Sequence, residues 1–208
     1  MTGNLFLASS NEGKLAEFIA LAGSTTSGAP PFKLALLSNF SSFLAFDESA
    51  PTFAENAAGK ALHYSRLAEC RVLADDSGLV VPALDGAPGV KSARYAGANA
   101  TSEQRNEKLL DAMHNLTGEH RRAYFVCVLA VAERGRPIAV ISARADGEIL
   151  SAPRGAAGFG YDPIFYIREL HKTFAELTSE EKSRISHRGK AFRRLLEVIT
   201  ASSHLAHS

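Results

Sequence analysis

Short apolar segments of strand length alternate along this chain with segments whose apolar residues recur at helical spacing. We expect strands at residues 5–8, 72–74, 123–132 and 138–145, and helices at residues 14–22, 53–68, 101–116 and 186–199. Thr101 and Thr178 each precede a Gln or Glu by three residues and match the capping box that begins a helix. In the first half of the chain helices connect the expected strands, and in the second half two expected strands form a hairpin. This order predicts an α/β or α+β fold with a mixed sheet.

Polar and glycine-rich residues mark where these elements end. The strand at residues 72–74 is expected to stop at Asp75-Asp76-Ser77-Gly78, and residues 23–31 have the composition of a surface loop. Gly59 weakens the second helix, and Ser186 offers a new N-cap after Thr178. The polar tail at residues 201–208 is expected to fray. We expect a single domain over residues 1–208.

Composition limits the class of protein. A chain of 208 residues, 46% of them hydrophobic, can bury a core without disulfides or metal. The 23 basic and 22 acidic residues argue against a nucleic-acid partner. The sequence shows no apolar run near the roughly 20 residues of a membrane helix and no basic leader. Cys70 and Cys127 lie in apolar segments without metal-ligand spacing, which favours a reducing, cytoplasmic location.

The polar segment Ser9-Ser10-Asn11-Glu12-Gly13-Lys14 lies between the first expected strand and the first expected helix. Such a loop can direct backbone N–H groups and a helix N-terminus at a phosphate, and Lys14 would add a positive charge. The spacing is not that of a P-loop, because only one glycine precedes the lysine. An ordinary capped connection is the alternative.

Two further segments carry carboxylates. Asp75 and Asp76 end an apolar strand, which is unfavourable unless a cation or hydrogen-bond donors compensate. Mg²⁺ prefers one or two carboxylates plus substrate phosphates, but adjacent strand residues point to opposite faces, so one ion need not contact both. On the second helix, Asn56 and Lys60 share a face with Glu55 alongside. These three could bind a metal–phosphate complex or form a solvated surface.

The last polar region begins at Gly158-Phe159-Gly160-Tyr161-Asp162-Pro163. Phe159 and Tyr161 could stack on a base, and Asp162 could orient one of its edges. On one straight helix Lys182 and Arg188 would lie about 240° apart, so they share a pocket only if the helix breaks. An N-cap between them supplies that break. A basic surface helix is the alternative.

Together these segments resemble a known family. Seven motifs occur in a fixed order over nearly the whole chain, and they are similar to those of the inosine triphosphatases, the pyrophosphatases of deaminated purine nucleotides such as dITP and XTP. The motifs are Asn11-Glu-Gly-Lys14, Thr52-Phe-x-Glu55-Asn56, Ala74-Asp-Asp-Ser-Gly78, Ser92-Ala-Arg-Tyr-Ala-Gly97, Gly158-Phe-Gly-Tyr-Asp-Pro163, Ala175-Glu-Leu-Thr178 and Glu181-Lys-Ser-x-x-Ser-His-Arg-Gly189.

The resemblance implies a mixed α/β fold of two lobes around a long curved sheet, with the nucleotide in the cleft between them. It implies a Mg²⁺-dependent homodimer that converts ITP, dITP and XTP to the monophosphate and pyrophosphate, which clears deaminated purines from the nucleotide pool. The expected partner is therefore a small-molecule nucleoside triphosphate, with no nucleic acid or membrane.

The resemblance also implies roles for individual residues. Asp76 would be the general base and a metal ligand, and Asp75 and Glu55 would help to hold Mg²⁺. Family members often have Thr-Gly-Asn where this chain has Ser9-Ser10-Asn11, and Ser10 lacks the backbone freedom of that glycine. The substrate-binding residues would be Ser9, Ser10, Asn11, Glu12, Gly13, Lys14, Lys60, Ser77, Phe159, Gly160, Tyr161, Asp162, Lys182, His187 and Arg188.

Selectivity has a physical basis in this set. Hypoxanthine and xanthine present a 6-oxo acceptor where adenine presents a 6-amino donor, so donors from His187 or Arg188 would favour the former. A mispaired buried donor costs about 1–3 kcal/mol, roughly 5- to 150-fold in discrimination. One rival function is a Maf-like nucleotide pyrophosphatase with another base preference, but Ser186-His-Arg-Gly189 favours the inosine-type enzyme. The other is a non-catalytic nucleotide sensor, which would be expected to have lost the carboxylates that this chain keeps at Glu55, Asp75 and Asp76.

Overall fold

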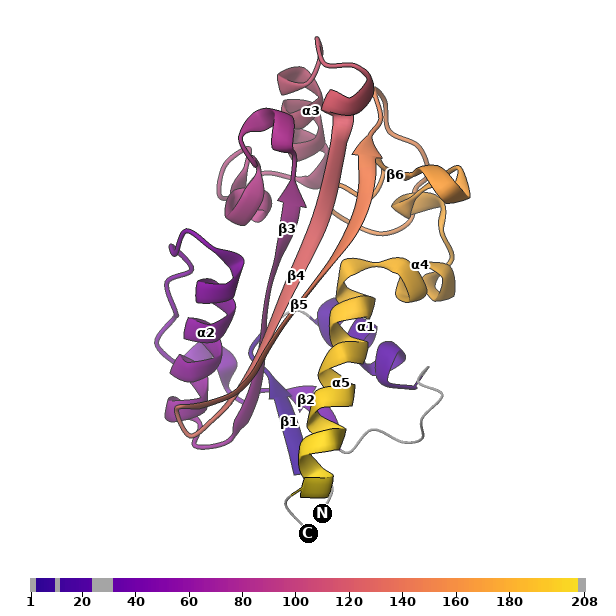
Figure 1. Ribbon diagram of the computed structural model, residues 1–208. Coiled ribbons are helices and arrows are strands. Elements are labelled where there is room, and N and C mark those ends of the chain that lie inside the picture. Colours follow the sequence, from indigo (N-terminus) through magenta and orange to yellow (C-terminus); the bar gives the residue numbers. More distant parts are fainter. Residues whose placement is uncertain (1–2, 10–11, 24–31, 206–208) are drawn as a thin grey trace. The chain divides into compact units, whose positions relative to one another are not determined.

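Figure 1 shows the computed structural model, which describes residues 3–9, 12–23 and 32–205 of the chain. Within these residues seven strands form one sheet in the order β2-β1-β3-β4-β5-β6-β7. Strand β1 is parallel to β2 and β3, whereas β6 is antiparallel to β5 and β7, so the predicted mixed sheet is confirmed. The strands are β1 (Gly3–Leu7), β2 (Phe32–Leu36), β3 (Arg71–Val80), β4 (Arg122–Glu133), β5 (Arg136–Ile149), β6 (Phe165–Ile167) and β7 (Lys172–Thr173).

The α-helices of the described residues begin largely where the sequence places them. Both predicted capping boxes are present, because Thr101 and Thr178 each exchange two hydrogen bonds with the residue three positions later. The extended backbone of Ser186 separates the last two helices and confirms the predicted break. None of the described helices is both long and apolar enough to cross a membrane. The helices are α1 (Glu12–Gly23), α2 (Phe53–Leu67), α3 (Ser102–Ala112), α4 (Ser179–Ile185) and α5 (His187–Leu205).

The chain divides into two compact units, which match the two lobes implied by the resemblance. The first unit contains the described residues up to Asp76, together with residues 127–143 and 188–205. The second unit contains residues 77–126 and 144–187. The boundaries fall within β3, β4 and β5 and at the junction of α4 with α5. Each unit has its own hydrophobic core.

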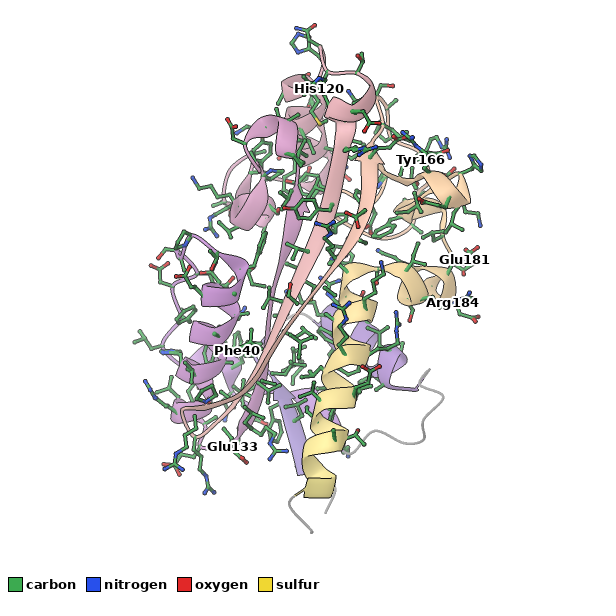
Figure 2. All side chains as sticks on the ribbon, viewed as in Figure 1. Phe40, His120, Glu133, Tyr166, Glu181 and Arg184 are labelled. Carbon is green, nitrogen blue, oxygen red and sulfur yellow. The ribbon has the colours of Figure 1, made fainter. Side chains whose placement is uncertain are left out.

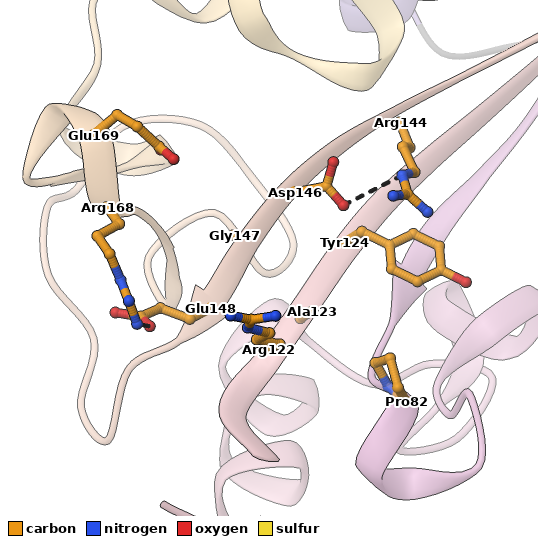
Figure 3. Close-up of a pocket in the computed structure, with 10 residues that line it drawn as sticks. All are labelled: Pro82, Arg122, Ala123, Tyr124, Arg144, Asp146, Gly147, Glu148, Arg168 and Glu169. Carbon is orange, nitrogen blue, oxygen red and sulfur yellow. Dashed lines mark hydrogen bonds and ion pairs between the residues drawn. The ribbon is translucent and has the colours of Figure 1, made fainter. Parts of the chain in front are cut away.

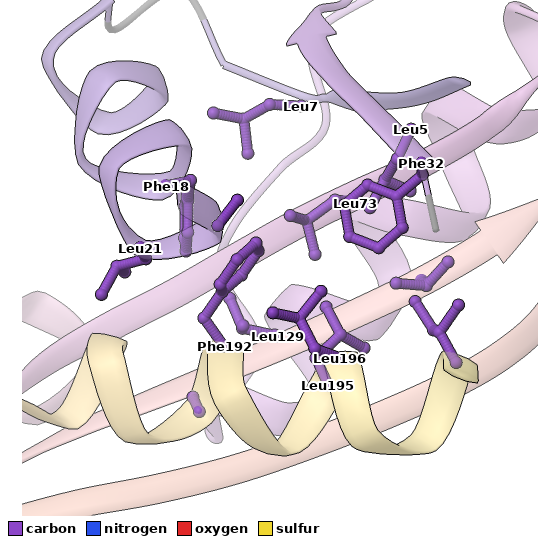
Figure 4. Close-up of a cluster of buried hydrophobic side chains, with 14 of the residues drawn as sticks. Leu5, Leu7, Phe18, Leu21, Phe32, Leu73, Leu129, Phe192, Leu195 and Leu196 are labelled. Atoms are coloured by element: carbon purple, nitrogen blue, oxygen red, sulfur yellow. The ribbon is translucent and has the colours of Figure 1, made fainter. Parts of the chain in front are cut away.

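The core of the first unit lies between the sheet and helices α1 and α5 (Figure 4). Phe18 of α1 and Phe192 of α5 contact each other with ring centroids 5.2 Å apart. Leu73 of β3 is fully buried in the same core. Because side chains alternate along a strand, Asp75 points to this face of β3 and Asp76 points to the opposite face.

The core of the second unit is built around three phenylalanines. Phe165 of β6 packs against Phe125 of β4 and against Phe174, with ring centroids 4.7 and 4.8 Å apart. Leu109 of α3 and Met113, directly after the helix, are fully buried in the same core. The core therefore fixes α3 and β6, the elements that flank the predicted base-binding loop.

The segment before α2 has no counterpart among the sequence motifs, yet it is packed onto that helix. Phe40, labelled in Figure 2, lies against Tyr64 of α2 with ring centroids 4.7 Å apart. A Cβ atom at Gly59 would lie 2.5 Å from the Phe46 ring, so the glycine that weakens the predicted helix makes room for this segment. The packing fixes the chain that leads into Glu48.

Three predicted boundaries are wrong. Strand β3 does not stop at Asp75 but continues to Val80, because cationic side chains compensate the carboxylate within the sheet. Helix α5 extends through residues 201–205, which were expected to fray, and it keeps an apolar face as far as Ile199. Helix α3 ends at Ala112 rather than near residue 116, because the chain turns at Met113.

One arginine of the second unit bonds only backbone carbonyls in the hydrogen bonds found among the described residues. Arg121 donates from Nε to Ile149 at 2.6 Å, from Nη2 to Leu150 at 2.7 Å, and from Nη1 to Met113 and Leu116 at 3.0 Å. These four bonds tie the end of β5 to the turn after α3. The guanidinium thus serves as a structural cross-link.

Arg121→Met is expected to lower the free energy of unfolding by about 2 kcal/mol, because it leaves several carbonyls without their charged donor. The measurement is urea unfolding of the purified protein. Arg122→Met is the matched control, since this exposed neighbour makes a surface ion pair with Glu119 and such pairs contribute at most about 1 kcal/mol. Equal stability of the two variants would rule out the cross-link.

Candidate active site

Asp75 is a fully buried carboxylate surrounded by cations of the first unit. Lys14 of α1 donates to both carboxylate oxygens at 3.0 Å. Burial alone would raise the pKa of Asp75, but the charges of Lys14, Arg188 and Lys60 lower it to about 2. Asp75 is therefore ionised at neutral pH and is compensated by side chains of the protein itself.

Asp76 has the opposite character. Its Oδ2 atom is buried and has no hydrogen-bond partner among the described residues. Burial and the nearby charges of Glu48 and Asp75 raise the pKa of its carboxyl group to about 6, although a hydrogen bond from Asn56 and the charge of Lys60 act in the other direction. A carboxylate that gains a proton this readily is suited to act as a general base.

Glu48 is the residue that the sequence analysis missed. Its Oε1 atom accepts a bond from Lys60 Nζ at 2.5 Å, and its charge acts on Asp76. Burial would lower the pKa of Lys60, but Glu48, Asp75 and Asp76 outweigh it and raise that pKa. Glu48 belongs to no motif with a characteristic spacing. The sequence feature that could have indicated it is its position, as an acidic residue shortly before the N-cap of α2.

The other predicted residues near the carboxylates are placed differently. Glu55 is exposed, and its carboxylate accepts a 2.7 Å bond from the Thr52 hydroxyl at the start of α2. Ser77 begins the second unit, and its buried hydroxyl has no partner among the described residues. The described part of the chain brings together no group of three or more His, Cys, Asp or Glu side chains suited to a metal ion.

The predicted phosphate-binding segment is only partly described. Ser10 and Asn11 lie outside the described residues. Ser9 is buried directly after β1, and the backbone of Glu12 and Gly13 begins α1, so this strand-to-helix connection is confirmed. Lys14 lies in the first turn of that helix, where it holds Asp75.

The predicted base-binding residues of the second unit form a connected group. Asp162 accepts bonds from the Phe159 backbone N–H at 2.7 Å and from Lys182 Nζ at 2.5 Å. The Lys182 ammonium also lies 5.1 Å from the centre of the Phe159 ring. Phe159 is 57% exposed, so its ring is accessible to a ligand. Gly160 connects Phe159 to the buried part of the loop.

Tyr161, His187 and Arg188 are buried. The Tyr161 ring belongs to the second core, and its hydroxyl donates to the Ser92 carbonyl at 2.9 Å. His187 stacks on Phe125 with ring centroids 4.7 Å apart. Arg188 begins the first-unit part of α5 and donates to Glu17 at 2.7 Å. Of the two predicted stacking rings, only Phe159 is exposed.

Two cavities lie in the second unit. One of about 580 Å³ lies between α3 and the glycine-rich loop and is lined in part by Asn106, Phe159 and Gly160. The other, of about 470 Å³, is lined by Tyr124 and by arginine and acidic side chains of β4, β5 and the turn after β6 (Figure 3). None of the predicted site residues that the structure describes lines this second cavity. Its arginines Arg144 and Arg168 are already paired with carboxylates.

Comparison with known proteins identifies the family of this chain. A sequence model of the Ham1 family matches residues 5–198. The dITP/XTP pyrophosphatase of Geobacillus kaustophilus is 48% identical over 193 residues, 93% of this chain and 92% of the relative. A dITP/XTP pyrophosphatase of Thermus thermophilus is 47% identical over 194 residues, 92% of this chain and 89% of the relative.

Solved structures give the same result. A HAM1 protein from Coxiella burnetii superposes with a TM-score of 0.85 at 42% identity, covering 97% of this chain and 100% of that one. The Ham1 protein of Staphylococcus aureus superposes with a TM-score of 0.84 at 38% identity, covering 96% and 99%. The match extends over both compact units and both groups of predicted site residues. The chain therefore belongs to the Ham1 family.

Proposed function

We propose that this protein hydrolyses deaminated purine nucleoside triphosphates, namely ITP, dITP and XTP, to the monophosphate and pyrophosphate. Two relatives that match over about nine-tenths of this chain carry the name dITP/XTP pyrophosphatase. The observation that carries the proposal is the contrast between two adjacent carboxylates: the buried Asp75 is fixed by Lys14, whereas the half-buried Asp76 has a raised pKa. Such a contrast separates a structural anion from a proton acceptor.

The reaction assigns one task to Asp76. A water molecule attacks the α-phosphorus, its oxygen forms the new P–O bond, and its proton passes to Asp76. The bond from the α-phosphorus to the bridging oxygen breaks, and pyrophosphate leaves. A pKa of about 6 makes Asp76 a better base than an ordinary aspartate while keeping it ionised at neutral pH.

We also propose that Mg²⁺ is the cofactor. The buried Oδ2 atom of Asp76, which has no partner within the described part of the chain, and the neighbouring Glu48 suit a cation. Mg²⁺ commonly takes only one or two carboxylates beside substrate phosphates. When bound, it would neutralise the charge that develops on the phosphates. Glu48 and Asp76 are better placed to hold the ion than the predicted Glu55, whose carboxylate caps α2. Lys60 and Lys14 would contact the triphosphate.

The base would be recognised by the second unit. The exposed Phe159 ring offers a stacking surface, and Lys182 and His187 are the proposed donors to the 6-oxo group. Arg188 is less suited to this role than the sequence predicted, because its guanidinium is bonded to Glu17. The resemblance further leads us to propose a homodimer in the cytoplasm; analytical ultracentrifugation tests the oligomeric state.

A substrate panel tests this function. The purified protein is given dITP, ITP, XTP, dATP, dGTP and dTTP with Mg²⁺ or with EDTA, and pyrophosphate and orthophosphate are measured separately. We expect pyrophosphate from ITP, dITP and XTP at a kcat/KM at least about 10-fold above that of dATP and dGTP, and only with Mg²⁺. Release from dTTP instead would overturn the base assignment, and no release from any substrate would overturn the enzyme.

A further inference from the structure

The backbone of the loop that carries Phe159 has high conformational freedom, because a glycine lies on each side of Phe159. Gly158 and Gly160, on either side of Phe159, have φ values of +78° and +63°. Glycine reaches such angles without steric cost, but it also leaves the chain free to leave them. Phe159 itself is mostly exposed, so packing of its ring fixes the loop only in part. Other contacts must determine where this ring stands.

Helix α3 supplies those contacts. The Gly160 N–H donates to the Ser102 hydroxyl at 3.2 Å, and the Gly160 carbonyl accepts from Asn106 Nδ2 at 3.2 Å. Ser102 and Asn106 are four residues apart and therefore lie on one face of the helix. Both polar groups of the Gly160 backbone are thus held by one helical surface.

Asn106 is an unusual residue for a purely structural position. It is 6% exposed, and its Oδ1 atom is buried without a partner among the described residues. A buried polar atom without a partner is destabilising, and an apolar side chain of the same size would avoid that loss. The amide is therefore better explained by the bond that its nitrogen makes to Gly160 than by the stability of α3.

The cavity of about 580 Å³ lies beside these contacts and is lined by α3 on one side and by the glycine-rich loop on the other. This space leaves room into which the loop could move if the bonds to Gly160 were lost. Within the loop, the Asp162 carboxylate accepts hydrogen bonds from the Phe159 N–H and from Lys182. Phe159 is thus positioned from both sides.

We propose that Ser102 and Asn106 are positioning residues that hold the Phe159 loop open for the base and thereby set the affinity for the substrate. This inference rests on the proposed role of Phe159 in base binding. Neither residue reaches the reacting phosphorus in this role, so the expected effect falls on KM and leaves kcat nearly unchanged.

Asn106→Leu tests the proposal because it removes the donor while keeping the size of the side chain. We expect KM for dITP to rise about 10-fold, the effect of losing one positioning hydrogen bond, with kcat unchanged and thermal stability unchanged or raised. Glu107→Leu is the matched control, since this exposed neighbour lines the same cavity. Ser102→Ala should also raise KM, and Ser102→Thr, which keeps the hydroxyl, should restore it.

A second readout follows the loop without any substrate. The chain contains no tryptophan, so Phe159→Trp places a single tryptophan on the loop, which can be excited selectively beside the tyrosines. Adding Asn106→Leu to Phe159→Trp is expected to lower the fluorescence anisotropy, whereas adding Glu107→Leu is not. Unchanged anisotropy, or an equal rise of KM in Glu107→Leu, overturns the positioning role. If Asn106→Leu lowers the anisotropy but leaves KM unchanged, the proposal is also overturned, and Phe159 does not bind the base. If the unaltered protein does not hydrolyse dITP, the proposed function itself has failed.

Discussion

Asp76→Asn is expected to lower kcat for dITP by about 10²- to 10⁴-fold, because an amide cannot accept the proton of the attacking water. The same change is expected to stabilise the metal-free protein. The folded state raises the pKa of Asp76 from an ordinary value of 3.8 to about 6. A raised carboxyl pKa means that the folded state holds the proton more tightly than the unfolded state.

The sign of the pH dependence follows from this shift. Below about pH 4 the carboxyl group is neutral in both states and contributes nothing unfavourable. As the pH rises from about 4 to 6, the unaltered protein loses stability, and above pH 6 the loss is complete. Asparagine stays neutral throughout, so the variant should be more stable by about 1–2 kcal/mol at pH 7.5, after allowance for solvent screening, and equal near pH 4.

Urea unfolding in EDTA at pH 4, 5, 6 and 7.5 measures this difference, and a steady-state dITP assay with Mg²⁺ measures turnover. Asp111→Asn is the control for removing a carboxylate, because this residue is exposed on α3 of the second unit. Turnover within about 10-fold of the unaltered protein would exclude Asp76 as the base. Equal free energies of unfolding of Asp76→Asn and the unaltered protein at every pH would show that the folded state does not raise the pKa of Asp76.

The parts of the fold that the sequence predicts correctly depend on local contacts. The capping boxes at Thr101 and Thr178 join residues three positions apart, and the break at Ser186 is likewise a property of neighbouring residues. The continuation of β3 through Asp75 was missed because the cation that permits it, Lys14, is 61 residues away in the sequence. A buried charge in a strand can only be interpreted once its partner is known.

The site shows the same division. The sequence motifs contain Asp76, Phe159 and Asp162, and Lys60 follows one of them by four residues. The motifs do not state which side chain bonds which. Glu48 was missed because its segment reaches α2 through aromatic packing on Tyr64, which no spacing rule describes. Tyr161 was predicted as a stacking surface because a tyrosine in a glycine-rich loop has the same pattern whether it is buried or exposed. Burial decides between these, and burial is a tertiary property.

Lys14 has a structural role in addition to the triphosphate contact proposed for it. Asp75 is fully buried in β3, and Lys14 is the cation that bonds both of its oxygens. Lys14→Met is expected to lower the free energy of unfolding by about 2–4 kcal/mol at pH 7, because a buried carboxylate then loses its bonded partner. Arg188 and Lys60 still act on Asp75, which keeps the expected loss below that of a wholly unpaired buried charge.

A double-mutant cycle separates this effect from phosphate binding. Asp75→Asn removes the buried charge, so Lys14→Met combined with Asp75→Asn should be more stable than Lys14→Met alone, as measured by urea unfolding at pH 7.

The pKa of Asp75 is lowered to about 2, so the stabilisation by Lys14 is complete above about pH 4 and is lost as the pH falls toward 2. A triphosphate that binds Lys14 must share it with Asp75, so Lys14→Met should also raise KM for dITP. Unchanged stability of Lys14→Met with a raised KM would mean that Lys14 serves the phosphate alone and that Arg188 and Lys60 suffice to hold the Asp75 charge in the sheet.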